Sequence, residues 1–314
     1  MNLLITGGCG FIGSNFINYF MNNPNLTKLV NFDAMYYCAN INNVEKSVSS
    51  DPRYHFVKGN LCSYDLVSHI LEEHSITHVI HFAAQSHVQN SFDDSMQYTQ
   101  DNIVGTHTLL ECCRKYNGIK KFIHVSTDEV YGESGDVQLD ETSILVPTNP
   151  YAATKAAAEM LVTSYIKSYN LPIIITRGNN VYGPNQYPEK LIPRFIQQLQ
   201  NGQHVTIQGD GSAKRSFLHV YDTCRAFEII LLKGNVGEIY NIGADVVDSE
   251  FTVMEIAELL VKLIKNDNEV CNYIKFIPDR PFNDSRYFIS NSKVKALGWE
   301  IEIPFQDGIK NLLQ

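Results

Sequence analysis

The sequence predicts an α/β protein in which helices cover both faces of a parallel, doubly wound sheet. Six short runs rich in β-branched and aromatic residues are apolar throughout rather than alternating, which is typical of strands buried on both faces. Helical segments separate these runs, and a repeating strand–helix order favours parallel strands joined by right-handed crossovers. A glycine-rich turn between the first run and the first helical segment supports the same architecture.

The expected strands follow one another through the first half of the chain: NLLIT (2–6), KLVNF (28–32), YHFV (54–57), HVIHF (78–82), KFIHV (121–125) and PIIIT (172–176). The expected helical segments lie near residues 13–22, 63–74, 93–116 and 150–169. After residue 177 the pattern becomes irregular, and three prolines stand close together at Pro184, Pro188 and Pro193.

The chain is therefore expected to divide near residue 177. We expect residues 1–177 to form a Rossmann-like domain, with later elements near 217–243 returning to it. Residues 178–314 should form mostly a smaller, mixed α/β substrate-binding portion. We expect this portion over the carboxyl edge of the sheet, where ligands bind in this architecture.

Composition is that of an ordinary globular protein: 44% of the 314 residues are hydrophobic and 19% are charged. The formal net charge of −9 argues against a general nucleic-acid binder, which needs a basic face. The seven cysteines form no C-x-x-C pair, which favours a reducing compartment. No apolar run could span a membrane and the first residues lack the basic region of a signal peptide, so we expect a cytoplasmic protein.

Three histidines, His74, His78 and His81, are the nearest approach to a metal-binding pattern. They straddle an expected junction between a helix and a strand, so their side chains need not converge. We therefore expect no metal site.

The first strand runs into Gly7-Gly8-Cys9-Gly10-Phe11-Ile12-Gly13, which fits G-x-x-G-x-x-G and, counted from Gly8, G-x-G-x-x-G. Glycines at this spacing allow a tight turn close to a pyrophosphate, and the following helix N-terminus presents unpaired N–H groups to the phosphates. Asp33 follows the second strand, twenty residues after Gly13. A carboxylate there accepts hydrogen bonds from the adenine ribose and repels a 2′-phosphate, so the motif predicts NAD rather than NADP.

A tyrosine and a lysine four residues apart occur at three places: Tyr54/Lys58, Tyr116/Lys120 and Tyr151/Lys155. Only the third pair is plainly helical, because Asn149 is a plausible N-cap and Pro150 suits the first helical position. On a helix the two side chains share a face, and the ammonium lowers the phenol pKa from about 10 towards neutrality. We expect Tyr151 to act as a base toward a sugar hydroxyl, and Lys155 to contact both Tyr151 and the nicotinamide ribose. The alternative is a surface aromatic–cation pair.

The glycine-rich turn, a Ser/Thr after the strand near 125 and the helical Tyr-x-x-x-Lys resemble the extended short-chain dehydrogenase/reductase family, over nearly the whole chain. Longer motifs are similar to those of the nucleotide-sugar 4,6-dehydratases: HFAAQSHVQNSF, HVSTDEVYG, NPYAATKA, NNVYGPNQYPEKLIP, GDGSAKRSFLHV and DRPFNDSRY. Within that group the chain most resembles the dehydratase portion of eukaryotic UDP-rhamnose synthases, and somewhat less the bacterial dTDP-glucose enzymes.

The resemblance implies an NAD-dependent lyase that converts UDP-glucose, dTDP-glucose or both to a 4-keto-6-deoxyglucose. It implies Glu129 as the base for the C5 proton, Asp128 as the acid for the departing C6 hydroxyl, and Thr127 as a partner of the 4-oxygen. An acid must be protonated when it acts, so we expect burial beside a like charge to raise the pKa of Asp128. Adjacent strand residues point to opposite faces, so the pair should lie where the strand breaks into a loop.

The resemblance also implies two sets of binding residues. Those for the cofactor are Gly7, Gly10, Phe11, Ile12, Gly13, Asp33, Ala34, Met35, Asn60, Leu61, Phe82, Ala83, Ala84, Tyr151 and Lys155. Those for the nucleotide sugar are Ser86, Thr127, Asn180, Lys190, Leu191, Thr206, Ile207, Gln208, Arg215, Arg280 and Asn283. The two arginines are expected at the diphosphate, where the guanidinium geometry suits phosphate oxygens.

The chain departs from the bacterial pattern at four places. Gln85 stands where those enzymes usually have Glu, Asn60-Leu61 replaces Asp-Ile, Asp101 replaces a threonine, and residues 244–247 lack an asparagine. The changes at 85 and 244–247 favour UDP-glucose. The two nucleotides differ by one methyl and one ribose hydroxyl, and a pocket discriminates a methyl by only about 1–3 kcal/mol, so acceptance of both remains open.

Two other functions fit parts of the sequence. A nucleotide-sugar 4-epimerase shares the cofactor and the Tyr–Lys pair, but inversion at C4 needs no elimination acid, so the carboxylates at 128–129 disfavour it. A non-catalytic NAD-binding sensor is disfavoured by the intact set of Thr127, Tyr151 and Lys155. The resemblance further implies a homodimer formed through the helices near 93–116 and 150–169.

Overall fold

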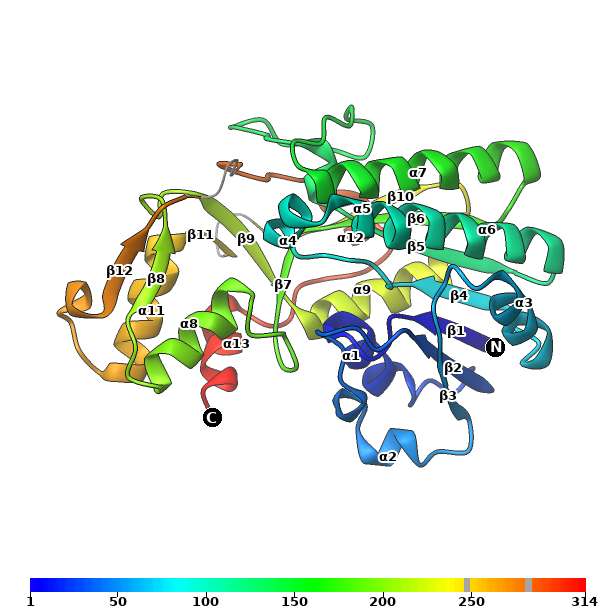
Figure 1. Ribbon diagram of the computed structural model, residues 1–314, viewed down its shortest axis with the longest axis horizontal. Helices are drawn as coiled ribbons and strands as arrows, with labels where there is room; N and C mark the ends of the chain where they lie inside the picture. The colour runs from blue at the N-terminus through cyan, green and yellow to red at the C-terminus, as the bar shows by residue number, and fades with distance from the viewer. Residues whose placement is uncertain (246–248, 280–283) are drawn as a thin grey trace.

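A seven-stranded sheet forms the centre of the larger of two lobes (Figure 1). The computed structural model describes residues 1–245, 249–279 and 284–314. The strand order is β10-β6-β5-β4-β1-β2-β3, and every neighbouring pair is parallel. The strands are β1 (Asn2–Thr6), β2 (Lys28–Asp33), β3 (Tyr54–Lys58), β4 (His78–His81), β5 (Lys121–Thr127), β6 (Ile173–Gly178) and β10 (Ile239–Ile242). The predicted doubly wound sheet is confirmed, and the six expected strands are β1 to β6.

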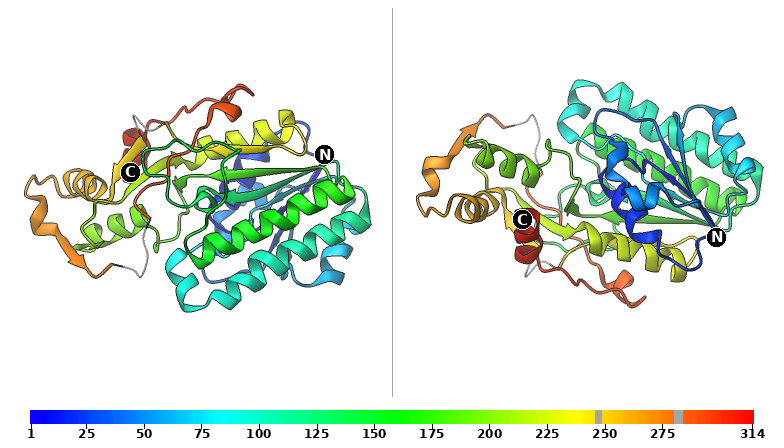
Figure 2. Two further views of the ribbon diagram at one scale, coloured as in Figure 1. Left: turned by 90° about the horizontal axis from the view of Figure 1, so that it is seen from above. Right: turned by 90° about the horizontal axis from the view of Figure 1, so that it is seen from below.

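Helices cover both faces of this sheet (Figure 2). Alternate residues of β1 supply the two cores: Leu3 and Ile5 pack with α1 and α9, whereas Leu4 packs with α3, α6 and α7. Burial on both sides explains why the strands are apolar throughout. The covering helices are α1 (Phe11–Phe20), α3 (Tyr64–Glu73), α6 (Gly105–Tyr116), α7 (Pro150–Tyr169) and α9 (Val220–Lys233).

The predicted helix over residues 93–116 is largely confirmed. It begins at Ser95 and continues through α5 (Ser95–Tyr98), the π-helical η2 (Thr99–Val104) and α6, and a separate short helix, α4 (Val88–Asp93), precedes it. Asp94 separates α4 from α5 and caps α5, because its carboxylate accepts a hydrogen bond from the Gln97 amide at 3.1 Å. After this break, the side-chain oxygen of Asn102 in η2 accepts a hydrogen bond from the Gln85 amide at 2.8 Å.

The smaller lobe lies on the side of the sheet away from the chain's N-terminus (Figure 1). In it, β9 pairs with β7 and β11, β8 pairs with β12, and Phe195, Leu260 and Phe305 lie in the core. Its elements are β7 (Asn180–Tyr182), α8 (Leu191–Gln200), β8 (Val205–Gln208), β9 (Lys214–His219), β11 (Glu250–Thr252), α11 (Val253–Lys265), η4 (Val270–Tyr273), β12 (Ile274–Ile277) and α13 (Phe305–Leu312). The remaining short helices are η1 (Ile41–Asn43), α2 (Lys46–Ser49) and α12 (Ser292–Lys295).

Within residues 1–245, 249–279 and 284–314, no helix combines the length and the apolar character needed to cross a membrane.

A buried ion pair joins α7 to the sheet. Arg177 on β6 is 4% exposed and donates to the carboxylate of Glu159, which is 1% exposed, at 2.7 Å. Arg177 also donates to the Tyr131 hydroxyl at 2.8 Å. Removing one partner of such a pair leaves an uncompensated charge in the interior, which is more costly than the pair itself is favourable.

Glu159→Ala is therefore expected to lower the free energy of unfolding by about 3–5 kcal/mol, because Arg177 stays buried without its counter-ion. Urea unfolding measures this change. The matched control is Asp307→Ala, which removes the exposed partner of Lys310 and should cost less than about 1 kcal/mol. A loss for Glu159→Ala no larger than that of the control would contradict the expected stabilising role of this pair.

Candidate active site

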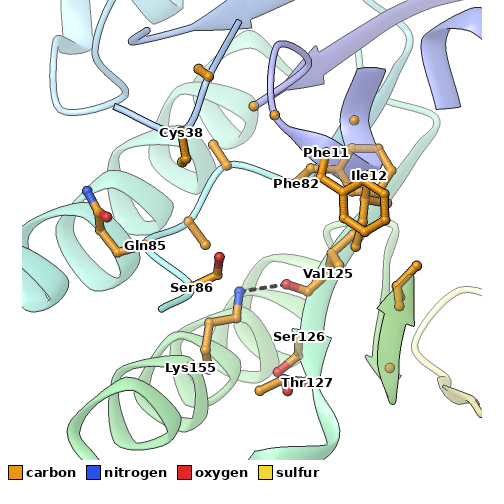
Figure 3. Close-up of a pocket in the computed structure, with 18 of the residues that line it drawn as sticks. Phe11, Ile12, Cys38, Phe82, Gln85, Ser86, Val125, Ser126, Thr127 and Lys155 are labelled. Carbon is orange, nitrogen blue, oxygen red and sulfur yellow. Dashed lines mark hydrogen bonds between the residues drawn. The ribbon is translucent and has the colours of Figure 1, made fainter. Parts of the chain in front are cut away.

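A cavity runs along the carboxyl ends of the central strands (Figure 3). Of the predicted cofactor residues, it is lined by Gly7, Gly10, Phe11, Ile12, Gly13, Asp33, Ala34, Asn60, Leu61, Phe82, Ala83, Ala84, Tyr151 and Lys155. Met35 is not among the lining residues, and its amide donates to the Asp33 carboxylate at 2.7 Å. Thr127, Asp128 and Glu129 line the same cavity. The structure therefore brings the predicted cofactor and acid–base residues to one place.

The glycine-rich turn leaves no room for side chains at two positions. A Cβ on Gly7 would lie 2.7 Å from backbone atoms of Ala83, and Gly7 has a φ of +72°. A Cβ on Gly13, inside α1, would lie 2.4 Å from the Gly7 carbonyl oxygen. The backbone of β1, the turn and α1 can pack this closely only because these residues are glycines, and the N-terminus of α1 then faces the cavity.

Two side chains in the cavity have the chemistry that a dinucleotide requires. Asp33 ends β2 and is 7% exposed, and its carboxylate also accepts a hydrogen bond from the Cys9 amide in the glycine-rich turn at 2.9 Å. Burial raises the pKa of Asp33. The hydroxyl of Ser126 is buried in the cavity wall and has no hydrogen-bond partner within the part of the chain that the structure describes. A buried, unsatisfied hydroxyl indicates a place for a polar group of a ligand.

The carboxylate pair lies at the junction of a strand and a short helix. β5 continues two residues beyond its predicted end, to Thr127, and Asp128–Tyr131 form the 3-10 helix η3. The expected irregular loop is thus a helical turn, which Thr127 caps by accepting a hydrogen bond from the Glu129 amide at 3.3 Å. Because the chain leaves the alternating strand geometry at this point, neighbouring side chains can both face the cavity.

Asp128 is the more deeply buried of the two carboxyl groups, at 3% exposure. Burial, followed by the charge of Glu129, raises the pKa of Asp128 to about 7, which confirms the predicted direction and cause. Asn179 and Thr127 oppose this shift by donating to its carboxylate at 2.7 and 3.2 Å. Burial also raises the pKa of Glu129, whose carboxylate accepts a hydrogen bond from Asn149 at 3.0 Å.

The Tyr151–Lys155 pair is helical, as predicted, and Asn149 caps α7 with Pro150 in the first turn. The predicted lowering of the Tyr151 pKa by Lys155 is wrong. Burial raises the pKa of Tyr151, and the charge of Glu129 adds to this effect. The Lys155 ammonium instead donates to the Val125 carbonyl at 2.6 Å, as Figure 3 shows, and burial lowers its own pKa to about 8.

The predicted substrate residues separate into three groups. Ser86, Thr127, Asn180 and Lys190 line the cavity, and the Lys190 ammonium donates to the Ser86 carbonyl at 2.8 Å. Leu191, Thr206, Ile207, Gln208 and Arg215 do not line it, because α8 and β8 belong to the smaller lobe, whose core contains Ile207. Arg280 and Asn283 lie outside the described residues.

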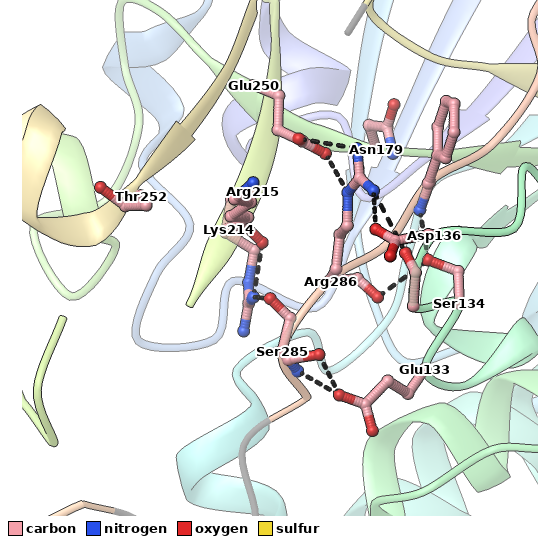
Figure 4. Close-up of polar contacts among 12 residues, drawn as sticks. Glu133, Ser134, Asp136, Asn179, Lys214, Arg215, Glu250, Thr252, Ser285 and Arg286 are labelled. Atoms are coloured by element: carbon pink, nitrogen blue, oxygen red, sulfur yellow. Dashed lines mark hydrogen bonds and ion pairs between the residues drawn. The ribbon is translucent and has the colours of Figure 1, made fainter. Parts of the chain in front are cut away.

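Arg215 nevertheless lies within electrostatic reach of the acid pair. Its guanidinium is 5.2 Å from the centre of the Tyr287 ring, and its charge opposes the rise in the pKa of both Asp128 and Glu129. Figure 4 shows its surroundings, where the Ser285 amide donates to Glu133, in the segment after η3, at 2.9 Å. A hydrogen bond from Arg215 to the Ser285 carbonyl, at 3.4 Å, places it beside this junction.

The sequence did not single out several side chains that contact the site. Asn179 begins the motif NNVYGPNQYPEKLIP, but only its neighbour Asn180 was assigned a role, and Asn149 was recognised only as a helix cap. Three departures from the bacterial pattern belong to one hydrogen-bond network through Tyr36: Asn60 donates to the Tyr36 hydroxyl at 2.8 Å, Tyr36 to Asp101 at 3.2 Å, and Gln85 to Asp101 at 2.9 Å. An amide at 85 therefore suits a carboxylate at 101.

The glycine-rich turn, the acidic residue after β2 and the Tyr-x-x-x-Lys helix around one cavity define an extended short-chain dehydrogenase/reductase. The chain belongs to the GDP-mannose 4,6 dehydratase family, whose model matches residues 4–312. A trifunctional UDP-glucose 4,6-dehydratase/UDP-4-keto-6-deoxy-D-glucose 3,5-epimerase/UDP-4-keto-L-rhamnose-reductase of Arabidopsis thaliana is 50% identical over 315 residues, covering 99% of this chain. The match covers 46% of that relative, so the chain spans about half its length.

Two solved structures are similar to the whole chain. One is the dTDP-glucose 4,6-dehydratase DesIV from Streptomyces venezuelae with NAD and TYD bound, with a TM-score of 0.93 and 36% identity, covering 99% of this chain and 95% of that one. The other is the UDP-glucose 4-epimerase from Thermotoga maritima with UDP-glucose, with a TM-score of 0.89 and 29% identity, covering 100% of both chains. The fold is therefore shared by enzymes that dehydrate and enzymes that epimerise.

The raised pKa of Asp128 predicts how stability depends on pH. The folded protein keeps the Asp128 proton up to about pH 7, whereas the unfolded chain releases it near pH 4. Between these values the folded state binds more protons, so Asp128 makes stability fall as the pH rises. Asp128→Asn removes the charge, and its thermal unfolding midpoint should exceed that of the wild type above pH 7, with the difference disappearing towards pH 4.

Thermal unfolding followed by circular dichroism at several pH values measures this difference. Asp307→Asn, at an exposed position, is the control and should leave the pH dependence unchanged. A lower midpoint for Asp128→Asn than for the wild type at pH 8 would show that the carboxylate is stabilised in its charged form, against this prediction.

Proposed function

We propose that the chain is an NAD-dependent nucleotide-sugar 4,6-dehydratase, a hydro-lyase that converts UDP-glucose, dTDP-glucose or both to the 4-keto-6-deoxyglucose nucleotide. The observation that carries this proposal is the buried pair Asp128 and Glu129 in the same cavity as Tyr151 and Lys155. Oxidation alone needs only the second pair. An acid and a base beside it supply what an elimination of water requires.

NAD is the proposed cofactor because the cavity residues fit it. The closely packed glycine-rich turn suits the pyrophosphate, the Asp33 carboxylate suits the adenine ribose, and the unpaired Ser126 hydroxyl offers a further polar contact. When bound, NAD⁺ would supply a positive charge and a reversible acceptor for hydride from the hexose.

Tyr151 is proposed to take the proton of the C4 hydroxyl. Burial raises its pKa in this structure, and the positive charge that bound NAD⁺ would bring favours the phenolate. Lys155, whose ammonium donates to the Val125 carbonyl, is proposed to contact the nicotinamide ribose, and its pKa, lowered by burial to about 8, leaves it mostly charged at pH 7. Thr127 is proposed to donate a hydrogen bond to the 4-oxygen.

The 4-ketone acidifies the neighbouring C5–H bond, which Glu129 is proposed to break as a general base. Asp128 is proposed to give its proton to the C6 oxygen, so that the C6–O bond breaks and water leaves. Its pKa of about 7 keeps a substantial protonated fraction at neutral pH, as an acid of this kind requires. The protons balance because Glu129 returns its proton to C5 as hydride reaches C6, and the proton that Tyr151 takes from the C4 hydroxyl matches the one that Asp128 gives to the departing water.

The nucleotide sugar is proposed to extend from the acid pair toward the smaller lobe. Asn180, Lys190 and Ser86 line the cavity in that direction, and the charge of Arg215 reaches the acid pair. The remaining proposed contacts are Leu191, Thr206, Gln208, Arg280 and Asn283, whereas the Ile207 side chain is fully buried in the core of the smaller lobe. On this proposal residues 1–177, with the returning elements near 217–243, hold the dinucleotide, and residues 178–314 bind mostly the nucleotide sugar.

A homodimer is also proposed, on the resemblance and on the exposed face of α7. Met160 on this face is 58% exposed. The first proposed dimer helix is continuous from Ser95 to Tyr116 through α5, η2 and α6.

A nucleotide-sugar 4-epimerase is the second candidate, since the Thermotoga maritima enzyme shares the fold. Epimerisation returns hydrogen to C4 and releases no water, so it does not require the acid and base proposed at Asp128 and Glu129. The mass of the product therefore separates the two candidates. A product lighter by one water supports the dehydratase, and an unchanged mass with inverted C4 supports the epimerase.

Glu129→Gln should abolish the loss of water from UDP-glucose or dTDP-glucose, because the amide cannot remove the C5 proton. Oxidation at C4 should persist and appear as absorbance of reduced nicotinamide. Tyr151→Phe should abolish both signals. Mass spectrometry of the nucleotide sugar and absorbance of the bound cofactor measure the two steps separately, and full dehydration by Glu129→Gln would refute its assignment as the base.

The chain should prefer UDP-glucose to dTDP-glucose, but by less than about 200-fold in kcat/KM, since the nucleotides differ chiefly by one methyl group. The Arabidopsis thaliana relative, at 50% identity, bears a UDP-glucose name. Competition between the two substrates in one reaction, followed by mass spectrometry, measures the ratio. A preference for dTDP-glucose would contradict this expectation.

A further inference from the structure

The side chain of Asn149 joins the two halves of the site. Asn149 is 6% exposed and caps α7, where its Oδ1 accepts a hydrogen bond from the Ala152 amide at 2.9 Å. Its Nδ2 donates to Oε2 of Glu129 at 3.0 Å. One buried amide therefore contacts both the helix that carries Tyr151 and Lys155 and the carboxylate proposed as the base.

The cap determines what Asn149 can offer to Glu129. Because Oδ1 is committed to a backbone N–H of α7, the group that faces the carboxylate is the NH₂ donor. A donated hydrogen bond favours the charged form of a carboxylate and fixes its direction. This bond is the largest effect that opposes the burial-driven rise in the pKa of Glu129.

Other charged and titratable groups also face Glu129. Asp128 adjoins it on η3, and Tyr151 faces it from α7. Asp284 and Tyr287 face it from the segment before α12, and the cations that reach it are Lys190 and Arg215. The two cations and the Asn149 amide favour the charged base, whereas burial and the neighbouring acids disfavour it.

Besides its bonds to Ala152 and Glu129, Asn149 is held in place through the residue before it. The Thr148 hydroxyl donates to the Asp284 carboxylate at 2.8 Å, and Asp284 is 3% exposed. The peptide before the cap is thereby held against the segment that carries Tyr287. Asn149 thus has little freedom to turn away from Glu129.

We propose that Asn149 is a positioning residue that keeps Glu129 charged and directed into the cavity, and that ties this base to the helix of Tyr151 and Lys155. The proposal rests on the proposed dehydratase function for its kinetic consequences. It assigns to Asn149 an effect on the removal of the C5 proton and none on the oxidation at C4.

Two substitutions separate this role from capping. Serine, aspartate and asparagine are nearly equivalent N-caps, so both Asn149→Ser and Asn149→Asp keep the cap. Serine is too short to reach Glu129, whereas aspartate replaces the donor with a second carboxylate. Asn149→Ser should therefore keep the thermal midpoint of the wild type and lose about 10- to 100-fold in the rate of dehydration at neutral pH, as expected for a lost hydrogen bond to a charged group.

The pH dependence of the dehydration rate distinguishes the two roles, because a purely structural role of Asn149 would leave it unchanged. In a plot of dehydration rate against pH, the midpoint of the acid limb should move to higher pH, by about one unit in Asn149→Ser and by more in Asn149→Asp. A base that is harder to deprotonate needs a higher pH to act. Reduced nicotinamide should accumulate in both variants, since oxidation at C4 continues while elimination is slow.

Asn23 offers a matched control. Its side-chain oxygen accepts a hydrogen bond from the Asn25 amide at 2.9 Å, and its NH₂ donates to Glu228 at 2.7 Å. Asn23→Asp makes the same chemical change next to a glutamate that does not line the cavity. This variant should keep the rate and the pH profile of the wild type.

A titration that needs no turnover keeps the proposal separate from the proposed function. With the carboxyl carbons of glutamate labelled for NMR, the Glu129 resonance is the one that Glu129→Gln removes. Its titration midpoint should rise in Asn149→Ser and rise further in Asn149→Asp, even if no nucleotide sugar were converted. Unchanged midpoints in both folded variants, or a wild-type rate and pH profile in Asn149→Ser, would overturn the proposal.

Discussion

The burial of two adjacent carboxyl groups is the constraint on which the rest of the site depends. Asp128 is 3% exposed and Glu129 lines the same cavity. Burial, and then the nearby charge of Glu129, raises the pKa of Asp128 to about 7. Asn179 and Asn149 hold them from different elements, at 2.7 and 3.0 Å, and each asparagine commits its oxygen to a backbone amide. Burial raises the pKa of both carboxyl groups, and their different hydrogen-bond partners suit them to the proposed roles of acid (Asp128) and base (Glu129).

The parallel sheet makes this arrangement possible. Carboxyl ends of parallel strands meet at one edge, so the glycine-rich turn after β1, the end of β5 and the end of β6 face one cavity. α7 packs along β5 and brings its N-terminal turn to the same edge. The passage from β5 directly into a 3-10 turn allows Thr127, Asp128 and Glu129 to face the cavity together, next to Tyr151. The residues proposed for oxidation and those proposed for elimination therefore share one opening.

The sequence predicted the sheet and the location of the site well because both depend on local patterns. Continuous apolar runs mark strands buried on both faces, and glycine spacing marks the turn after β1. The helix predicted from residue 93 begins at Ser95, because Asp94 is its cap, which spacing alone did not reveal. The high pKa of Tyr151 was missed because spacing reveals that Lys155 shares a face but not that it bonds the Val125 carbonyl. Asn179 lies in a recognised motif, but its contact with Asp128 joins distant parts of the chain and could not be predicted from the motif alone.

The central claim is that hydrogen leaves C4 of the hexose and returns to C6 of the same molecule while the acidic pair expels water. Its most direct test uses a mixture of two substrates, one carrying deuterium at C4 together with heavy carbon throughout the hexose, and the other unlabelled. The account predicts that deuterium appears on the methyl group of product molecules that also carry heavy carbon. Deuterium in solvent, or on the methyl group of products without heavy carbon, would contradict it.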